Sequence, residues 1–211
     1  MTLAGKHVLV TAGPTHEPID PVRVIANRSS GRQGFAIAKA AAEAGARVTL
    51  VAGPVALETP PGVTRIDVET TEQMADAVFL ALPADAAILV AAVADWRVEA
   101  SASKLKKSSG PPQLRFLPTR DILAELGASD RRPRMLIGFA AETENVVEQA
   151  IAKRQGKGAD WIVANDVSGD VMGGDRNRVH MITVEGVEDW AEAAKEVVAL
   201  QLVTRIADAL S

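Results

Sequence analysis

The chain has 211 residues, of which 47% are hydrophobic and only 3% aromatic, and its formal net charge is −4. This length suffices for one domain with a core of Ala, Val, Leu and Ile, and the negative charge argues against a general nucleic-acid binder. The absence of cysteine excludes disulfides, a thiolate nucleophile and cysteine-based metal sites.

The first half of the chain alternates short apolar runs with amphipathic segments. It predicts, in order, a strand at 6–12, a loop at 13–30, a helix at 31–44, a strand at 46–52, a strand at 63–68, a helix at 71–82 and a fully apolar strand at 85–95.

The second half opens with a polar, basic stretch at 96–113, which predicts a mobile flap. After it we expect an edge strand at 113–118, a helix at 119–127 with Thr119 as its N-cap, a strand at 134–142, a helix at 144–155, a strand at 159–166, a Gly-rich loop at 167–177, a strand at 178–185 and a last helix at 188–209.

Strands that alternate with helices of this length predict an α/β fold, with a Rossmann-like doubly wound sheet, mostly parallel, and with a flap and an extra strand region. We expect a single domain over residues 1–211. Ligands of such sheets bind beyond the carboxyl ends of the strands. The segments expected there are "TAG", "AAVAD", "GFAAE" and "VAND".

The chain shows no targeting or membrane signal. "MTLAGKH" lacks the apolar core of a signal peptide, and the longest apolar run, "AAILVAAVA", is shorter than the roughly 18 residues of a spanning helix. We therefore expect a cytoplasmic protein that binds neither a membrane nor nucleic acid.

The stretch "NRSSGRQG", residues 27–34, precedes the first amphipathic helix. Glycines and hydroxyls at a helix start bring backbone N–H groups close to an anion, which predicts a phosphate site. An ordinary N-capped helix whose glycines serve packing is the alternative. A dinucleotide site fits less well, because a long loop separates Gly13 from these glycines and the strand at 46–52 is followed by no acid.

Five blocks in order, "VTAGPTHEPIDPVRVIANRSSGRQGFAIA", "AAVADWR", "KLKK", "GFAAET" and "AND", resemble the phosphopantothenate–cysteine ligase family of coenzyme A biosynthesis. The resemblance covers residues 6–208. It implies an enzyme that joins 4′-phosphopantothenate and L-cysteine through an acyl-cytidylate made from CTP, with Mg²⁺ as the expected metal. It also implies a homodimer, and a possible fused or associated flavin-dependent decarboxylase.

The resemblance implies a role for individual residues, each of which has an ordinary structural alternative. Asn27 and Lys104 would be catalytic, and Arg23, Ala91, Ala92 and Asp95 would contact the phosphopantothenate, with Arg23 reaching that of the neighbouring subunit. The nucleotide would contact Gly13, Ser29, Ser30, Gly31, Gly34, Asp95, Asp121, Ile122, Phe139, Lys153, Lys157 and Asn165. No metal ligand can be assigned.

One departure concerns residues 119–122, which read "TRDI" where many bacterial members read N-P-D-I. Asp121 and Ile122 match, whereas Thr119 and Arg120 do not. Because the family uses this loop to recognise the base, the preference for CTP over ATP stays open. A non-catalytic nucleotide-binding module and an NAD(P)-dependent oxidoreductase remain the alternative functions.

Overall fold

The computed structural model describes residues 2–142, 144–166 and 176–211. Its centre is an eight-stranded sheet in the order β12-β11-β10-β9-β6-β1-β4-β5. The helices are α1 (Arg32–Glu43), α2 (Thr71–Leu80), α3 (Ile122–Gly127), α4 (Val146–Lys157) and α5 (Lys195–Ala209). The strands of the sheet are β1 (His7–Ala12), β4 (Arg47–Ala52), β5 (Val63–Asp67), β6 (Ala86–Leu89), β9 (Met135–Glu142), β10 (Trp161–Asp166), β11 (Arg176–Ile182) and β12 (Val187–Ala194).

Six neighbouring strands of the sheet run parallel to one another, namely β5, β4, β1, β6, β9 and β10. Strands β11 and β12 pair antiparallel beyond β10 and form one edge of the sheet. Numbered along the chain, the parallel strands lie in the order 3-2-1-4-5-6, which is the doubly wound arrangement. The expected fold class is therefore confirmed. The strand order reverses between β1 and β6, and ligands of such sheets bind in the crevice at that point.

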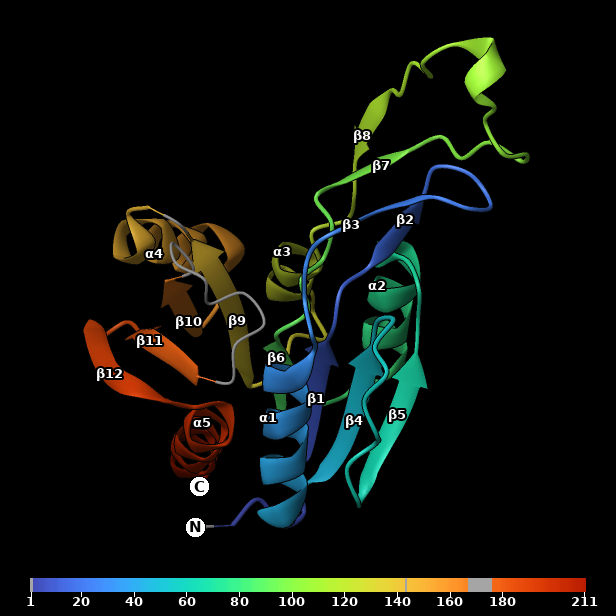
Figure 1. The fold of residues 1–211 in the computed structure, drawn as a ribbon. Helices are drawn as coiled ribbons and strands as arrows, with labels where there is room; N and C mark the ends of the chain where they lie inside the picture. Colours follow the sequence, from blue (N-terminus) through green and yellow to red (C-terminus); the bar gives the residue numbers. More distant parts are fainter. Residues whose placement is uncertain (1, 143, 167–175) are drawn as a thin grey trace.

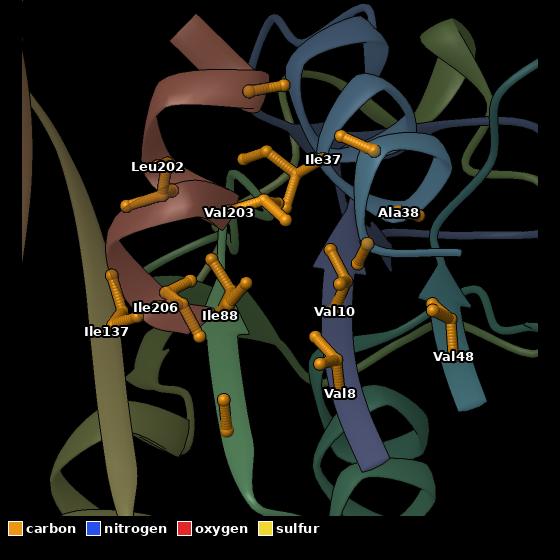
Figure 2. Packing of buried hydrophobic residues seen from close by; sticks show 14 of the residues in the cluster. Val8, Val10, Ile37, Ala38, Val48, Ile88, Ile137, Leu202, Val203 and Ile206 are labelled. Carbon is orange, nitrogen blue, oxygen red and sulfur yellow. The ribbon is translucent and has the colours of Figure 1, made fainter. Parts of the chain in front are cut away.

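Helices cover both faces of the sheet, α1 and α5 on one and α2, α3 and α4 on the other (Figure 1). The alternation of side chains along β1 explains how: Val8 and Val10 face α1 and α5, whereas Leu9 faces the opposite layer. Figure 2 shows Val203 and Ile206 of α5 close to Ile37 and Ile88 in the first of these layers. A core made mainly of aliphatic side chains thus fills both sides.

Two short antiparallel ribbons project from the carboxyl edge of the sheet (Figure 1). One pairs β2 (His16–Pro18) with β3 (Val24–Ala26), inside the segment that the sequence predicted as loop. The other pairs β7 (Trp96–Val98) with β8 (Phe116–Pro118), and between them lies a 3₁₀ turn, η1 (Lys107–Ser109). The predicted flap therefore extends from a β-ribbon.

Three further predictions of secondary structure were wrong. The strand predicted at 85–95 ends at Leu89, and the helix predicted at 188–209 begins only at Lys195, after strand β12. Asp121, not Thr119, caps α3, because its carboxylate accepts a hydrogen bond from Ala124 N. Most of the predicted Gly-rich loop, 167–175, lies outside the described residues. Within the described part of the chain, no helix is long and apolar enough to span a membrane.

Gly53 lets the turn after β4 cross the turn after β1 at close range. A Cβ at Gly53 would lie 1.7 Å from the carbonyl oxygen of Pro14. We expect Gly53→Ala to lower the free energy of unfolding by about 3 kcal/mol, because backbone atoms must move apart. Urea unfolding measures this. Gly156→Ala is the control, because nothing lies within 4 Å of its Cβ and we expect it to stabilise α4 by up to about 1 kcal/mol. Equal stability of the two variants would contradict the close approach.

Candidate functional site

The start of α1 lies at the crevice between β1 and β6. Gly31, its N-cap, has a φ of 74°, and no side chain caps the helix. Gly13, directly after β1, has a φ of 81°, and the Cβ position of Gly31 lies 3.5 Å from the Gly13 backbone. A Cβ at Gly34 would lie 2.5 Å from that of Ala12. These glycines are required by backbone conformation and close approach, and the N-cap of α1 is itself a glycine without a capping side chain.

Ser29 and Ser30 come directly before this helix start, and both are half-buried. The hydroxyl of Ser29 accepts a hydrogen bond of 3.3 Å from Gly31 N. The motif predicted from the sequence as a phosphate site therefore lies at the N-terminus of a helix, the kind of position at which proteins bind anions.

Residues 90–95, which follow β6, are held in place by hydrogen bonds to the end of β1 and the segment after it. Thr11 Oγ1 accepts from Val90 N (3.1 Å) and Ala91 N (3.2 Å), and Gly13 O accepts from Ala92 N (2.9 Å). Thr15 Oγ1 accepts from Ala94 N at 2.9 Å. Val90 N also donates to Thr11 O of β1 at 3.3 Å, so the run departs from regular pairing with β1 beyond residue 90, where hydroxyls and a turn carbonyl accept its N–H groups.

Asn27 connects the two parts of the site. Its side chain is exposed, and its Nδ2 donates a hydrogen bond of 2.8 Å to the carbonyl oxygen of Val93. Asn27 therefore lies beside the residues after β6 and two positions before Ser29. Ala91 and Ala92 are half-buried and Asp95 is exposed, so the small residues leave the backbone of this loop accessible.

Basic side chains approach the same edge from α4. Lys153 Nζ donates to Phe139 O at 2.9 Å, and Lys157 forms an ion pair with Asp121. Burial lowers the pKa of Lys153 below its usual value, although the charges of Glu142, Asp121 and Asp95 oppose the shift. Burial would raise the pKa of Asp121, but the hydrogen bonds from Lys157 and Ala124 N and the charges of Lys157 and Lys153 together outweigh it, and the net shift of the pKa is downward.

The remaining predicted nucleotide contacts lie at the ends of the neighbouring strands. Phe139 lies in β9 and packs against the core, and Ile122 is buried at the start of α3. Asn165 pairs with Ala141 across β10 and β9. The Oδ1 atom of Asn165 is buried without a hydrogen-bond partner in the described part of the chain. An unsatisfied acceptor at a strand end is consistent with a ligand contact.

Two of the predicted residues lie on the projecting ribbons. Arg23 binds the buried carboxylate of Asp20 through Nε (3.0 Å) and Nη2 (2.5 Å), and Nη2 also donates to Leu105 O at 2.9 Å. This pairing with Arg23 holds the pKa of Asp20 far below its usual value. Arg23 therefore joins the β2–β3 ribbon to the segment after β7. Lys104 is exposed next to Leu105, on a segment that extends away from the sheet edge (Figure 1).

Sequence reasoning missed the residues that hold the site together. Thr11 and Thr15 position the loop after β6, and Thr119 Oγ1 donates to Ala94 O at 2.6 Å. Gln33, in α1, accepts a hydrogen bond of 2.7 Å from Asn177 of β11. The only signal in the sequence is the position of the threonines at the ends of predicted elements, which does not reveal their partners.

A shallow groove of about 460 Å³ lies on the other side of β1, along the ends of β4 and β5. None of the predicted site residues lines it. Val55, at its wall, lies 3.1 Å from the Cβ positions of both Gly13 and Gly31, so the groove borders the start of α1. The lining residues are His16, Pro54, Val55, Arg65, Asp67, Val68, Glu69 and Gln73.

Comparison with known proteins gives consistent matches over nearly the whole chain. Residues 3–210 match the family described as the DNA/pantothenate metabolism flavoprotein C-terminal domain. The chain is 44% identical to the coenzyme A biosynthesis bifunctional protein CoaBC of Vibrio parahaemolyticus, over 97% of the chain and 53% of that protein. It is 44% identical to CoaBC of Escherichia coli (strain K12), over 95% of the chain and 51% of that protein.

Among solved structures, the C-terminal domain of a CoaBC protein matches with a TM-score of 0.84 and 40% identity, and 98% of this chain and 96% of that one are covered. The chain spans about half the length of the curated relatives it matches.

Proposed function

The chain belongs to the family of DNA/pantothenate metabolism flavoprotein C-terminal domains, and we propose that it is a CTP-dependent phosphopantothenate–cysteine ligase of coenzyme A biosynthesis. One observation carries the proposal: Asn27 Nδ2 bonds to Val93 O and so brings the motif before α1, where we propose that phosphates bind, next to the loop after β6. A nucleotide phosphate and an acyl substrate held at these two places would lie side by side.

In the first step, the carboxylate of 4′-phosphopantothenate attacks the α-phosphorus of CTP. A carboxylate O–P bond forms, the bond to the bridging oxygen breaks, and pyrophosphate leaves. The N-terminal end of α1, together with Lys153 and Lys157, would stabilise the negative charge of the phosphates. Lys157 would exchange its ion pair with Asp121 for the nucleotide.

In the second step, the neutral amine of L-cysteine attacks the acyl carbon. A C–N bond forms, the C–O bond to the cytidylate breaks, CMP leaves and the amine loses a proton. Asn27, as an uncharged donor, would stabilise the oxyanion that forms at this carbon. The small residues Ala91 and Ala92 would let the pantothenate arm lie against the backbone. Lys104 would neutralise the negative charge of the departing CMP, once the segment that carries Lys104 reaches the site.

The described residues contain no cluster of three or more His, Asp or Glu side chains that could hold a metal ion. We therefore propose no set of protein ligands for Mg²⁺. This cation keeps several waters and is commonly held by phosphate oxygens together with few side chains. It would supply positive charge to the triphosphate.

The lowered pKa of Lys153 gives a test of its proposed contact with the triphosphate. Only the charged ammonium binds an anion, so the KM for CTP should rise at alkaline pH with a midpoint below the usual lysine value. Above that midpoint the rise approaches tenfold per pH unit. Lys153→Arg should abolish it, because arginine stays charged. Initial rates from pH 7 to 10 measure this, and the same slope in both proteins would contradict the contact.

We also propose that the protein is a homodimer whose projecting ribbons pair with those of a second copy. The ribbons expose large apolar side chains, namely Val22, Val24, Trp96 and Phe116, which are 43–62% exposed. Apolar groups gathered on one projection are typical of an interface. Sedimentation velocity measures the mass, and a single-chain mass at micromolar concentration would contradict the dimer. We also propose that the protein acts in the cytoplasm. Its proposed protein partner is a flavin-dependent decarboxylase, either fused to this chain or associated with it.

The function is tested by incubating the protein with 4′-phosphopantothenate, L-cysteine, Mg²⁺ and either CTP or ATP. We expect 4′-phosphopantothenoyl-L-cysteine and CMP in equal amounts, detected by mass spectrometry, and no product when any one substrate is omitted. Product with ATP alone would retain the ligase and change its nucleotide. Nucleotide binding without product would indicate a non-catalytic module.

A further inference from the structure

Thr119 also holds the loop after β6, from the side of α3. Thr119 follows β8 and precedes α3, and it makes two hydrogen bonds to this loop. Its Oγ1 donates to Ala94 O at 2.6 Å, and its backbone N–H donates to Asp95 O at 3.0 Å. Thr119 is half-buried, so these contacts are partly shielded from water.

The next residue, Arg120, fixes this segment to two helices. Its guanidinium contacts Glu125 of α3 through Nε (3.0 Å) and Nη2 (2.5 Å), and Nη1 contacts Glu72 (3.1 Å) and Asp76 (3.0 Å) of α2. Its carbon Cζ also lies 5.8 Å from the centre of the Phe79 ring. The hydrogen bond to Glu125, with smaller contributions from the other two acids, raises the pKa of Arg120, although burial opposes the shift. Arg120 therefore connects the residue that follows Thr119 to both α2 and α3.

The third residue, Asp121, reaches the lysines of α4. Its carboxylate caps α3 and pairs with Lys157. Consecutive Cα atoms are 3.8 Å apart and each residue has only two soft torsions. Only one residue separates Asp121 from Thr119, so a backbone shift of Asp121 on loss of its pair with Lys157 would reach the hydrogen bonds of Thr119.

We propose that Thr119 is a positioning residue that couples occupation of the nucleotide side of the site to the geometry of residues 91–95, where the acyl substrate would lie. This inference rests on the proposed function. Within three residues, segment 119–121 contacts the loop after β6 through Thr119, helices α2 and α3 through Arg120, and Lys157 through Asp121. Nucleotide binding would tighten phosphopantothenate binding through this segment, and phosphopantothenate would tighten nucleotide binding by the same factor.

The test compares Thr119→Val, which removes the hydroxyl but keeps the shape and the backbone N–H, with Thr119→Ser, which keeps the hydroxyl. Thr204→Val is the matched control, because Thr204 Oγ1 makes the same kind of bond, 2.8 Å to Leu200 O, on the exposed side of α5. Initial rates over a grid of CTP and phosphopantothenate concentrations give the factor by which each substrate changes the apparent affinity for the other.

We expect Thr119→Val to reduce this factor about tenfold, because Ala94 O loses its donor, whereas Thr119→Ser and Thr204→Val stay within about threefold of the unaltered protein. A merely structural role would lower the melting temperature without changing the factor. The inference is overturned if Thr119→Val keeps the original factor, or if Thr119→Ser or Thr204→Val loses it equally.

Hydrogen–deuterium exchange separates this inference from the ligase proposal. CTP with Mg²⁺, and no other substrate, should slow exchange of the amides in residues 91–95 in the unaltered protein and in Thr119→Ser, but much less in Thr119→Val. If the unaltered protein forms no product, the ligase proposal is wrong. The exchange of the amides in residues 91–95 still shows whether Thr119 couples nucleotide binding to this loop. Equal protection in all three proteins, or none in the unaltered protein, would overturn the inference.

Discussion

Asn27→Asp is expected to reduce the turnover of the complete reaction by about 10²-fold or more. The substitution removes the N–H donor that bonds to Val93 O and places a carboxylate against that carbonyl oxygen. The same negative charge would face the oxyanion formed during acyl transfer, and the loss of one such donor typically costs 10²–10³ in kcat. Steady-state formation of the product, with all three substrates saturating, measures the effect.

Gln201→Glu is the control for Asn27→Asp. It makes the same change of amide to acid, with the same change in net charge, at an exposed position of α5. We expect it to keep the original turnover. If the two variants are equally active, or if Asn27→Asp loses its activity only because it unfolds at the assay temperature, the catalytic assignment of Asn27 is wrong.

Lys104→Gln should let the acyl-cytidylate accumulate while turnover falls by about 10²-fold or more. A cation over the α-phosphate stabilises the charge that develops as CMP leaves, and glutamine cannot supply it. Activation would continue, so pyrophosphate would still appear in a burst. Acid quenching followed by mass spectrometry detects the intermediate. Lys106→Gln and Lys107→Gln are matched controls on the same segment, and accumulation in either one would contradict the special role of Lys104.

The position of Lys104 makes a second version of this experiment informative. The segment that carries Lys104 extends away from the sheet edge of its own chain (Figure 1), and Arg23 and Asp20 hold the neighbouring Leu105. In a dimer, Lys104 could therefore serve the site of the partner. Mixed dimers of Asn27→Asp and Lys104→Gln would then contain one intact site and recover activity. Mixed dimers without recovered activity would place Lys104 and Asn27 of one chain in the same site.

The sheet could be predicted from the sequence because its strands are continuous apolar runs separated by amphipathic helices. The shorter elements could not. Residues 90–95 have the composition of a buried strand, yet they form a loop in which Thr11 and Thr15 accept backbone N–H groups. The alanines and acids at 187–194 fit a helix, but this segment pairs with β11 and covers its edge.

The candidate site could be predicted only in part, for the same reason. The glycines and Asn27 were identifiable because they lie within one continuous motif, and the family follows from five such blocks. Thr119 was expected to cap α3, but its partners at Ala94 and Asp95 lie 24 or more residues away in the chain. Contacts over such a separation are fixed by tertiary packing and leave no local pattern. The roles of the site residues remain predictions that the variants test.

The central claim, a ligase that activates its acid before the amine reacts, is tested most directly by pyrophosphate release without cysteine. The unaltered protein would receive 4′-phosphopantothenate, Mg²⁺ and CTP, and L-cysteine would be added later. We expect a burst stoichiometric with the protein, followed by sustained release once cysteine is present. No release under either condition, with CTP or with ATP, would contradict the claim.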